Sequence, residues 1–283
     1  MKAVVLAYHD VGITGLEMLR KSGIEIVSVF THRDDPSENT WFASVAEWAA
    51  DAGITVHAPD DINHPIWINR IRELNADCLF SFYYRKLVCP DLLDLFPDRC
   101  FNLHGSLLPS YRGRAPVNWV LVNGETRTGV TLHHMTPKAD AGDIVAQRIV
   151  DIDPEENAAT LMQKVCSAAG MLLEEQLPLI RDGRAERRPQ DESEATVYPR
   201  RTWEDGRIDW NLSAEAVNNL VRAVTRPYPG AIGQVGDRRI RIWKSTVDVA
   251  SHEIPGTVIS TSPLVVSCGA ESLRIDFGQT DDG

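Results

Sequence analysis

The residues best suited to chemistry lie in one stretch, residues 102–116, which reads NLHGSLLPSYRGRAP. Asn102 and His104 are separated by one residue, so in an extended strand both side chains face the same side. An amide can donate to an oxyanion, and an imidazole can exchange a proton near neutral pH. Ser106 lacks the Gly-x-Ser-x-Gly surroundings of a nucleophilic serine. The stretch therefore indicates acyl transfer in which the nucleophile arrives with the substrate.

A longer pattern, from His104 to Pro116, reads His-Gly-Ser-Leu-Leu-Pro-x-x-Arg-Gly-x-x-Pro and resembles the signature of folate-dependent formyltransferases. A second motif of that family, Asp-x-Gly before an apolar strand, is matched by Asp140-Ala-Gly-Asp-Ile. The resemblance covers nearly the whole chain and is strongest in residues 100–145. It implies that Asn102, His104 and Asp140 form the catalytic set of an N-formyltransferase. His104 would serve as base and then as acid, Asn102 would stabilise the oxyanion, and Asp140 would orient the imidazole.

The resemblance also implies a co-substrate, 10-formyltetrahydrofolate. The loop after the strand at 77–82 would meet the pterin through its backbone, and the loop before Asp140 would lie against the folate. The residues implied to contact folate are Lys86, Leu87, Val88, Arg114, Thr136, Pro137, Lys138, Ala139 and Asp140. A further hypothesis is that Arg201 binds a phosphate group of the substrate.

Three runs bear on the amine substrate: residues 7–10, 82–85 and 111–119. Together they resemble the formyltransferase domain of a bifunctional enzyme that acts on UDP-4-amino-4-deoxy-L-arabinose. That resemblance implies a role in lipid A modification and polymyxin resistance, with a UDP-linked amino sugar as substrate. It also implies a decarboxylase domain or partner, although the chain stops at Gly283 without room for that half. Three alternatives stay open: another nucleotide-linked amino sugar, methionyl-tRNA formyltransferase, and a non-catalytic folate or nucleotide-sugar binding module.

The formal net charge of the 283 residues is −11, which argues against nucleic acid as the main partner. Proteins that grip nucleic acid need a basic surface, because phosphate contacts supply most of the affinity. No segment has the length of a signal peptide or a membrane span, so we expect a cytoplasmic protein without membrane insertion. The five cysteines show no Cys-x-x-Cys spacing, and residues 60–65 are interpreted as a helix cap. No metal site is predicted.

Strand-like and helix-like segments alternate through the first two thirds of the chain, beginning with a strand at 2–8, a helix at 14–22 and a strand at 24–31. This order predicts an α/β fold with a Rossmann-like, mostly parallel sheet flanked by helices. The first turn lacks Gly-x-Gly-x-x-Gly, so NAD binding is not inferred. In the strand at 129–135, His133 and His134 fall on opposite faces. Further helices are expected at 41–53 and at 157–176, the latter ending near Pro178.

We expect three parts: a catalytic domain at 1–189, a linker at 190–210 and a smaller C-terminal OB-like β-barrel domain at 211–283. The short alternating runs that predict this barrel are 238–244, 256–260, 264–268 and 272–277. The polar segment 32–40 is interpreted as a flexible loop.

Overall fold

The computed structural model describes residues 1–33, 40–235 and 238–280, which form two compact units. The first unit comprises Met1–Gly113, Thr128–Val150 and Gln163–Val197, and the second comprises Arg114–Arg127, Asp151–Met162 and Tyr198–Gly283. Most of the predicted loop at 32–40 lies outside the described residues. The boundaries expected at 189 and 211 stay a prediction.

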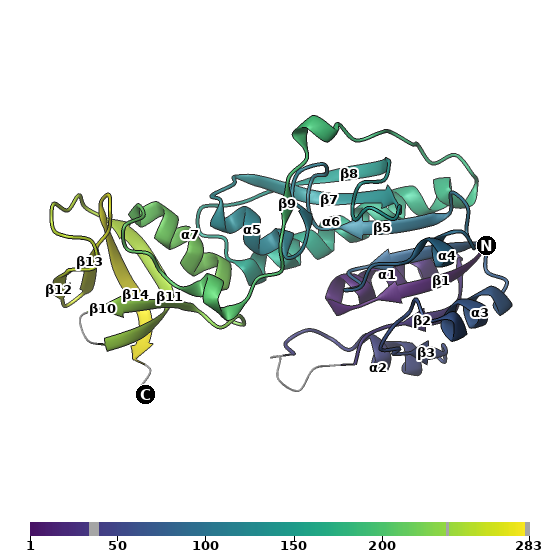
Figure 1. The fold of residues 1–283 in the computed structure, drawn as a ribbon, viewed down its shortest axis with the longest axis horizontal. Helices are drawn as coiled ribbons and strands as arrows, with labels where there is room; N and C mark the ends of the chain where they lie inside the picture. The colour runs from purple at the N-terminus through teal and green to yellow at the C-terminus, as the bar shows by residue number, and fades with distance from the viewer. Residues whose placement is uncertain (34–39, 236–237, 281–283) are drawn as a thin grey trace. The chain divides into compact units, whose positions relative to one another are not determined.

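A seven-stranded sheet with the order β3-β2-β1-β4-β5-β7-β8 forms the centre of the first unit (Figure 1). Its strands are β1 (Lys2–Ala7), β2 (Glu25–Phe30), β3 (Val56–His57), β4 (Cys78–Phe82), β5 (Cys100–His104), β7 (Arg127–His134) and β8 (Ile144–Asp151). Neighbouring strands from β3 to β5 are parallel, and β7 is antiparallel to β5. The predicted mostly parallel sheet is confirmed.

The helices of this part of the chain are α1 (His9–Lys21), α2 (Val45–Asp51), α3 (Pro65–Glu73), α4 (Pro90–Leu93) and α6 (Ala158–Arg181). Helix α1 packs on β1, β2 and β4. A Cβ atom added at Gly15 would lie 2.3 Å from the ring of Phe82, so only glycine allows this close approach of helix and strand. Gly15 therefore has a packing role between α1 and β4.

Three predicted helix boundaries are wrong. Helix α1 begins at His9, directly after β1, and α2 begins at Val45, which leaves Trp41 outside the helix with its ring centroid 4.8 Å from that of His9. Helix α6 continues through Pro178 to Arg181. The last turn is retained because Leu177 and Ile180 are buried, and this burial offsets the hydrogen bond that proline cannot donate.

The second unit contains a five-stranded antiparallel sheet with the order β10-β11-β14-β13-β12. Its strands are β10 (Ala231–Val235), β11 (Arg238–Asp248), β12 (Val258–Thr261), β13 (Leu264–Ser267) and β14 (Ser272–Thr280). Strand β10 was not expected from the sequence. Helix α7 (Ala214–Val224) packs on β11 and against α5 (Pro116–Val122) (Figure 1). The smaller C-terminal β domain is thus present as an all-antiparallel sheet.

A third sheet has two strands and pairs β6 (Arg112–Gly113) with β9 (Val197–Tyr198). Short 3₁₀ turns η1 (Glu192–Glu194) and η2 (Trp203–Gly206) flank β9. Among the described helices, none combines the length and the apolar character that a membrane span requires.

Candidate active site

The carboxyl ends of three parallel strands are aligned at one edge of the large sheet. Ala7 at the end of β1 pairs with Phe82 of β4, and Phe82 pairs with Leu103 of β5. The chain then leaves these strands near His9, Tyr83 and His104. In open α/β sheets, ligands bind outside the carboxyl ends of the strands. This edge is therefore where a site is expected.

Asn102, His104 and Asp140, the three residues that the sequence singled out, come together at this edge. We call them the Asn-His-Asp cluster. Asp140 Oδ1 lies 3.6 Å from Nδ1 of His104 and 3.4 Å from Nδ2 of Asn102. Asn102 and His104 share one face of β5 because strand side chains alternate, and Asp140 arrives from the loop between β7 and β8. The cluster thus combines a hydrogen-bond donor, a proton carrier and a negative charge.

The signature loop orients the imidazole of His104. Nε2 lies 2.8 Å from the carbonyl oxygen of Tyr111, and because a carbonyl can only accept, Nε2 carries a proton. Ser106 stabilises the same turn by donating to the carbonyl of Ser110 at 2.7 Å. Nδ1 therefore faces Asp140. A proton that arrives on Nδ1 would be stabilised by the carboxylate.

Asp140 is held as a carboxylate. Its Oδ2 accepts a hydrogen bond from the backbone N–H of Gly113 at 2.9 Å. Burial by itself would raise the pKa of Asp140, but the nearby imidazole of His104, the contact with His133 and the Gly113 N–H together lower that pKa well below its ordinary value. The group is consequently ionised across the neutral pH range.

The Asp-x-Gly motif has a steric basis. A Cβ atom at Gly142 would lie 1.9 Å from the carbonyl oxygen of His134, a distance that no side chain could tolerate. Asp140 itself has φ = 53°, in the left-handed region, which aspartate tolerates better than most residues. The glycine lets the loop run close against β7, and this approach brings Asp140 to the cluster.

His133 is a fourth member of the site that sequence reasoning did not assign. It pairs across the strands with Asn102, and its Nε2 lies 3.0 Å from Asn102 Nδ2 and 3.6 Å from Asp140 Oδ1. Its Nδ1 lies 2.8 Å from the carbonyl of His134, so Nδ1 donates and Nε2 accepts from the amide. Alternation in the strand placed His133 and His134 on opposite faces, but only the strand register shows which of them meets Asn102.

The loop predicted to meet the pterin is held in shape by Asn63. The side chain of Asn63 donates to the carbonyl of Leu87 at 3.0 Å and accepts from the N–H of Cys89 at 2.8 Å. Leu87 and Lys86 are exposed, Val88 is buried, and the Lys86 ammonium group donates to the carbonyl of Asp60. Sequence reasoning missed Asn63 because it lies in the segment interpreted as a helix cap.

That cap interpretation is confirmed for His64, whose Nδ1 accepts from the N–H of Ile66 at 3.3 Å at the start of α3. Among the described residues, no group of three or more His, Cys, Asp or Glu side chains is arranged to hold a metal ion.

The other predicted folate residues fall in two places. Thr136, Pro137, Lys138 and Ala139 form an exposed loop that leads directly into Asp140. In it, Thr136 Oγ1 donates to the carbonyl of Lys138 at 2.8 Å. Arg114 belongs to the second unit, where it is exposed and its N–H donates to the carbonyl of Tyr198 at 3.0 Å.

Arg201 also belongs to the second unit. Its guanidinium lies 4.5 Å from the ring centroid of Trp119 and donates to the carbonyl of Asp205 at 2.8 Å. The proposed contact of Arg201 with a substrate phosphate stays a prediction.

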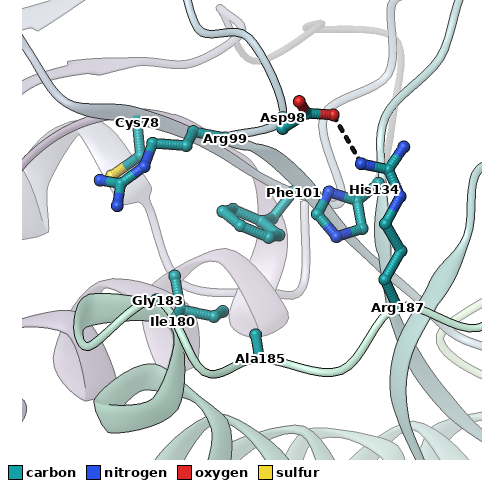
Figure 2. Close-up of a pocket in the computed structure, with 9 residues that line it drawn as sticks. All are labelled: Cys78, Asp98, Arg99, Phe101, His134, Ile180, Gly183, Ala185 and Arg187. Carbon is teal, nitrogen blue, oxygen red and sulfur yellow. Dashed lines mark hydrogen bonds and ion pairs between the residues drawn. The ribbon is translucent and has the colours of Figure 1, made fainter.

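A cavity of about 160 Å³ lies on the opposite face of β5 and β7 (Figure 2). Phe101 and His134, which line it, are the sequence neighbours of Asn102 and His133 and therefore point the other way. Figure 2 also shows the ion pair between Asp98 and Arg187, which is 2.5 Å long. The sheet separates this cavity from the Asn-His-Asp cluster.

Both parts of the chain match family models of formyl transferases, and solved structures of such enzymes share the fold. The family model described as "Formyl transferase" matches residues 1–177, and "Formyl transferase, C-terminal domain" matches residues 201–283. An N-formyltransferase from Helicobacter canadensis, solved with folinic acid and dTDP-3-aminofucose, is 20% identical with a TM-score of 0.77, and the match covers 98% of this chain and 100% of that one.

Two further structures are similar. WlaRD, a sugar 3N-formyl transferase solved in the presence of dTDP and 5-N-formyl-THF, is 19% identical with a TM-score of 0.74, over 100% of this chain and 98% of that chain. Phosphoribosylglycinamide formyltransferase from Bacillus halodurans is 25% identical with a TM-score of 0.55, over 62% of this chain and 95% of that one. Since the first family model alone spans more than half of the residues, the chain belongs to the formyl transferase family.

Proposed function

We propose that this protein transfers the formyl group of 10-formyltetrahydrofolate to the primary amine of a nucleotide-linked amino sugar. The observation that carries the proposal is the convergence of Asn102, His104 and Asp140 at the carboxyl edge of β5. Two similar structures, an N-formyltransferase and a sugar 3N-formyl transferase, were solved with a folate derivative together with dTDP-3-aminofucose or dTDP.

The proposed reaction begins when the amine attacks the formyl carbon and the carbonyl oxygen becomes an oxyanion. Asn102 Nδ2 has two N–H groups, of which one binds His133 at 3.0 Å and the other makes only a long contact of 3.4 Å with Asp140. The second N–H is the one that can turn to the oxyanion. A donor of this kind typically contributes about 2.7–4 kcal/mol to the transition state.

His104 would move the proton from the amine to N10 of the leaving folate. Nε2 is bound to Tyr111, so Nδ1 is the nitrogen left for exchange. Its distance of 3.6 Å from Asp140 is too long for a hydrogen bond but short enough for the carboxylate to stabilise the imidazolium that forms. The C–N bond to N10 then breaks, and the product is an amide.

An aromatic cluster at the carboxyl ends of β1 and β4 supports a nucleotide sugar as the amine substrate. The ring centroid of His9 lies 4.2 Å from that of Phe42 and 6.2 Å from that of Tyr83, and the Arg85 guanidinium lies 4.5 Å from the ring centroid of Tyr8. Burial, partly offset by Asp10, lowers the pKa of His9 to about 4, so this ring is neutral at physiological pH. Flat neutral rings suit a nucleobase, and a guanidinium suits a phosphate.

Apart from Phe42, these side chains belong to residues 7–10 and 82–85, two of the runs that resemble enzymes of UDP-4-amino-4-deoxy-L-arabinose. We therefore propose that sugar nucleotide as the specific substrate, with lipid A modification and polymyxin resistance as the setting. The cytoplasmic location and a decarboxylase partner stay predictions. The net charge of −11 disfavours initiator tRNA.

The test is to incubate the purified protein with 10-formyltetrahydrofolate and, separately, UDP-4-amino-4-deoxy-L-arabinose, dTDP-3-aminofucose and initiator methionyl-tRNA. Mass spectrometry would report the gain of one CO unit. We expect the UDP sugar to be formylated fastest. Formylation of the dTDP sugar alone would overturn the specific substrate, and formylation of the tRNA alone would overturn the whole proposal.

A further inference from the structure

We propose that Gln190 is a positioning residue that couples Arg112 of the signature loop to the backbone of Asp140 and so holds the carboxylate beside His104. This inference rests on the proposed function, because it assigns the coupling a purpose in formyl transfer. All the residues involved lie in the first unit.

The side-chain amide of Gln190 is fully used. Its Nε2 donates to the carbonyl oxygens of Asp140 and Gly142, at 2.8 and 2.7 Å. Its Oε1 accepts from Nε and Nη2 of Arg112, at 3.2 and 2.7 Å. Carbonyls only accept and a guanidinium only donates, so the orientation of this amide is unambiguous. Gln190 is thus a direct bridge between the two motifs that the sequence singled out.

Arg112 makes the bridge rigid. It is 2% exposed, and its remaining N–H groups form a bidentate pair with Glu192 at 3.1 and 2.7 Å. Glu192 in turn binds Lys138 at 2.7 Å. A buried guanidinium is stable only when its N–H donors are satisfied. Because Gln190 and Glu192 both accept from Arg112, the guanidinium fixes their positions relative to each other.

The Asp140 loop needs such a support. Asp140 has φ = 53°, a conformation that is strained outside glycine and persists only when its surroundings impose it. The preceding residues 136–139 are exposed. The two carbonyls bound by Gln190 lie on either side of Ala141, so the amide fixes the backbone at Asp140 and again two residues later at Gly142.

The first test replaces Gln190 with methionine, which has a similar length, adds no charge and leaves Arg112 its pair with Glu192. We expect kcat for formyl transfer to fall roughly tenfold to a hundredfold, as for the loss of the two hydrogen bonds to the Asp140 loop, with little change in KM for the amine. Gln163→Met, at an exposed glutamine of α6 in the same unit, is the matched control and should leave kcat unchanged. If Gln190→Met does not fold, Gln190→Asn is the second variant. Its side chain is one methylene shorter, so the amide cannot reach both carbonyls, and we expect the same fall in kcat.

The second test needs no substrate. Carboxyl ¹³C NMR of aspartate-labelled protein, with Asp140→Asn to assign the signal, follows the titration of Asp140. We expect its low pKa to move up toward the ordinary value in Gln190→Met. A folded Gln190→Met protein with unchanged kcat, or with an unchanged Asp140 titration, would overturn the positioning role. A wild-type protein that formylates no amino sugar would instead overturn the proposed function, and the NMR result would still stand by itself.

Discussion

The two faces of the β5–β7 strand pair hold their carboxylates in different ways. On one face, Asp140 lies near two imidazoles and an amide. The imidazoles can gain or lose a proton, and the amide can change its hydrogen-bond partner. On the other face, Asp98 and Asp143 are both bound by Arg187, at 2.5 and 2.6 Å. A guanidinium stays charged and cannot take up or release a proton in this range. The first face is therefore arranged for proton exchange, whereas the second is arranged for fixed ion pairs.

The adjacent histidines show the same contrast. His133 is hydrogen-bonded through both ring nitrogens, to Asn102 and to the backbone of His134. His134 packs on the ring of Phe101, with centroids 4.9 Å apart. Burial, reinforced by Arg187, lowers the pKa of His134, so it behaves as a neutral ring on the cavity side (Figure 2). Neighbours in sequence therefore have different physical roles.

The largest effect is expected from His104→Ala. Loss of the proton carrier should reduce formyl transfer by about 10²–10⁴-fold, while folate binding survives because the folate loops are unchanged. Turnover by mass spectrometry and binding by calorimetry measure the two effects. Turnover at the wild-type rate in this variant would show that His104 does not carry the proton, and the face of Asp140 would then not be a site of proton exchange.

Asn102→Ala should follow, with kcat reduced by about 10²–10³-fold through loss of the oxyanion donor. The measurement is kcat with saturating folate. A change confined to KM would instead assign Asn102 to substrate binding.

His133→Phe and His134→Phe form a matched pair across the sheet. The first removes the acceptor that orients the Asn102 amide, so kcat should fall about tenfold, as for one lost hydrogen bond. The second keeps an aromatic ring against Phe101 and should leave kcat close to that of the wild type. Equal losses in the two variants would show that the faces are not independent.

The pH dependence of unfolding tests Asp140. Because the folded state lowers the pKa of this group, it stabilises the fold above the ordinary aspartate pKa, and the contribution is lost as the pH falls through the lowered folded value. Denaturant unfolding of the wild type and of Asp140→Asn should therefore differ most near neutral pH and converge in acid. A difference that grew in acid would contradict the sign of the shift.

Arg187→Gln should have the smallest effect. Its ion pairs are solvent-exposed on the Asp98 side, so unfolding should change by only about 0–1 kcal/mol, with activity unchanged. Thermal unfolding and the formylation assay together check this. A large loss of activity would connect the cavity face to the reaction.

The sequence, through its resemblance to formyltransferases, predicted the three residues of the Asn-His-Asp cluster, and its periodicity predicted a mostly parallel sheet but not strand β10. Strand periodicity put Asn102 and His104 on one face, and Gly142 marked the turn that brings Asp140 to them.

Only the tertiary structure decided which histidine meets Asn102, which side chain supports Asp140 and why α6 passes Pro178. His133 is selected by the antiparallel register of β7 on β5, and Gln190 lies in a segment that the sequence marked only as a linker. Strand periodicity and turn signals are local, acting over a few residues. Register and hydrogen bonds between distant segments depend instead on how the whole chain packs, and no short window of sequence contains that information.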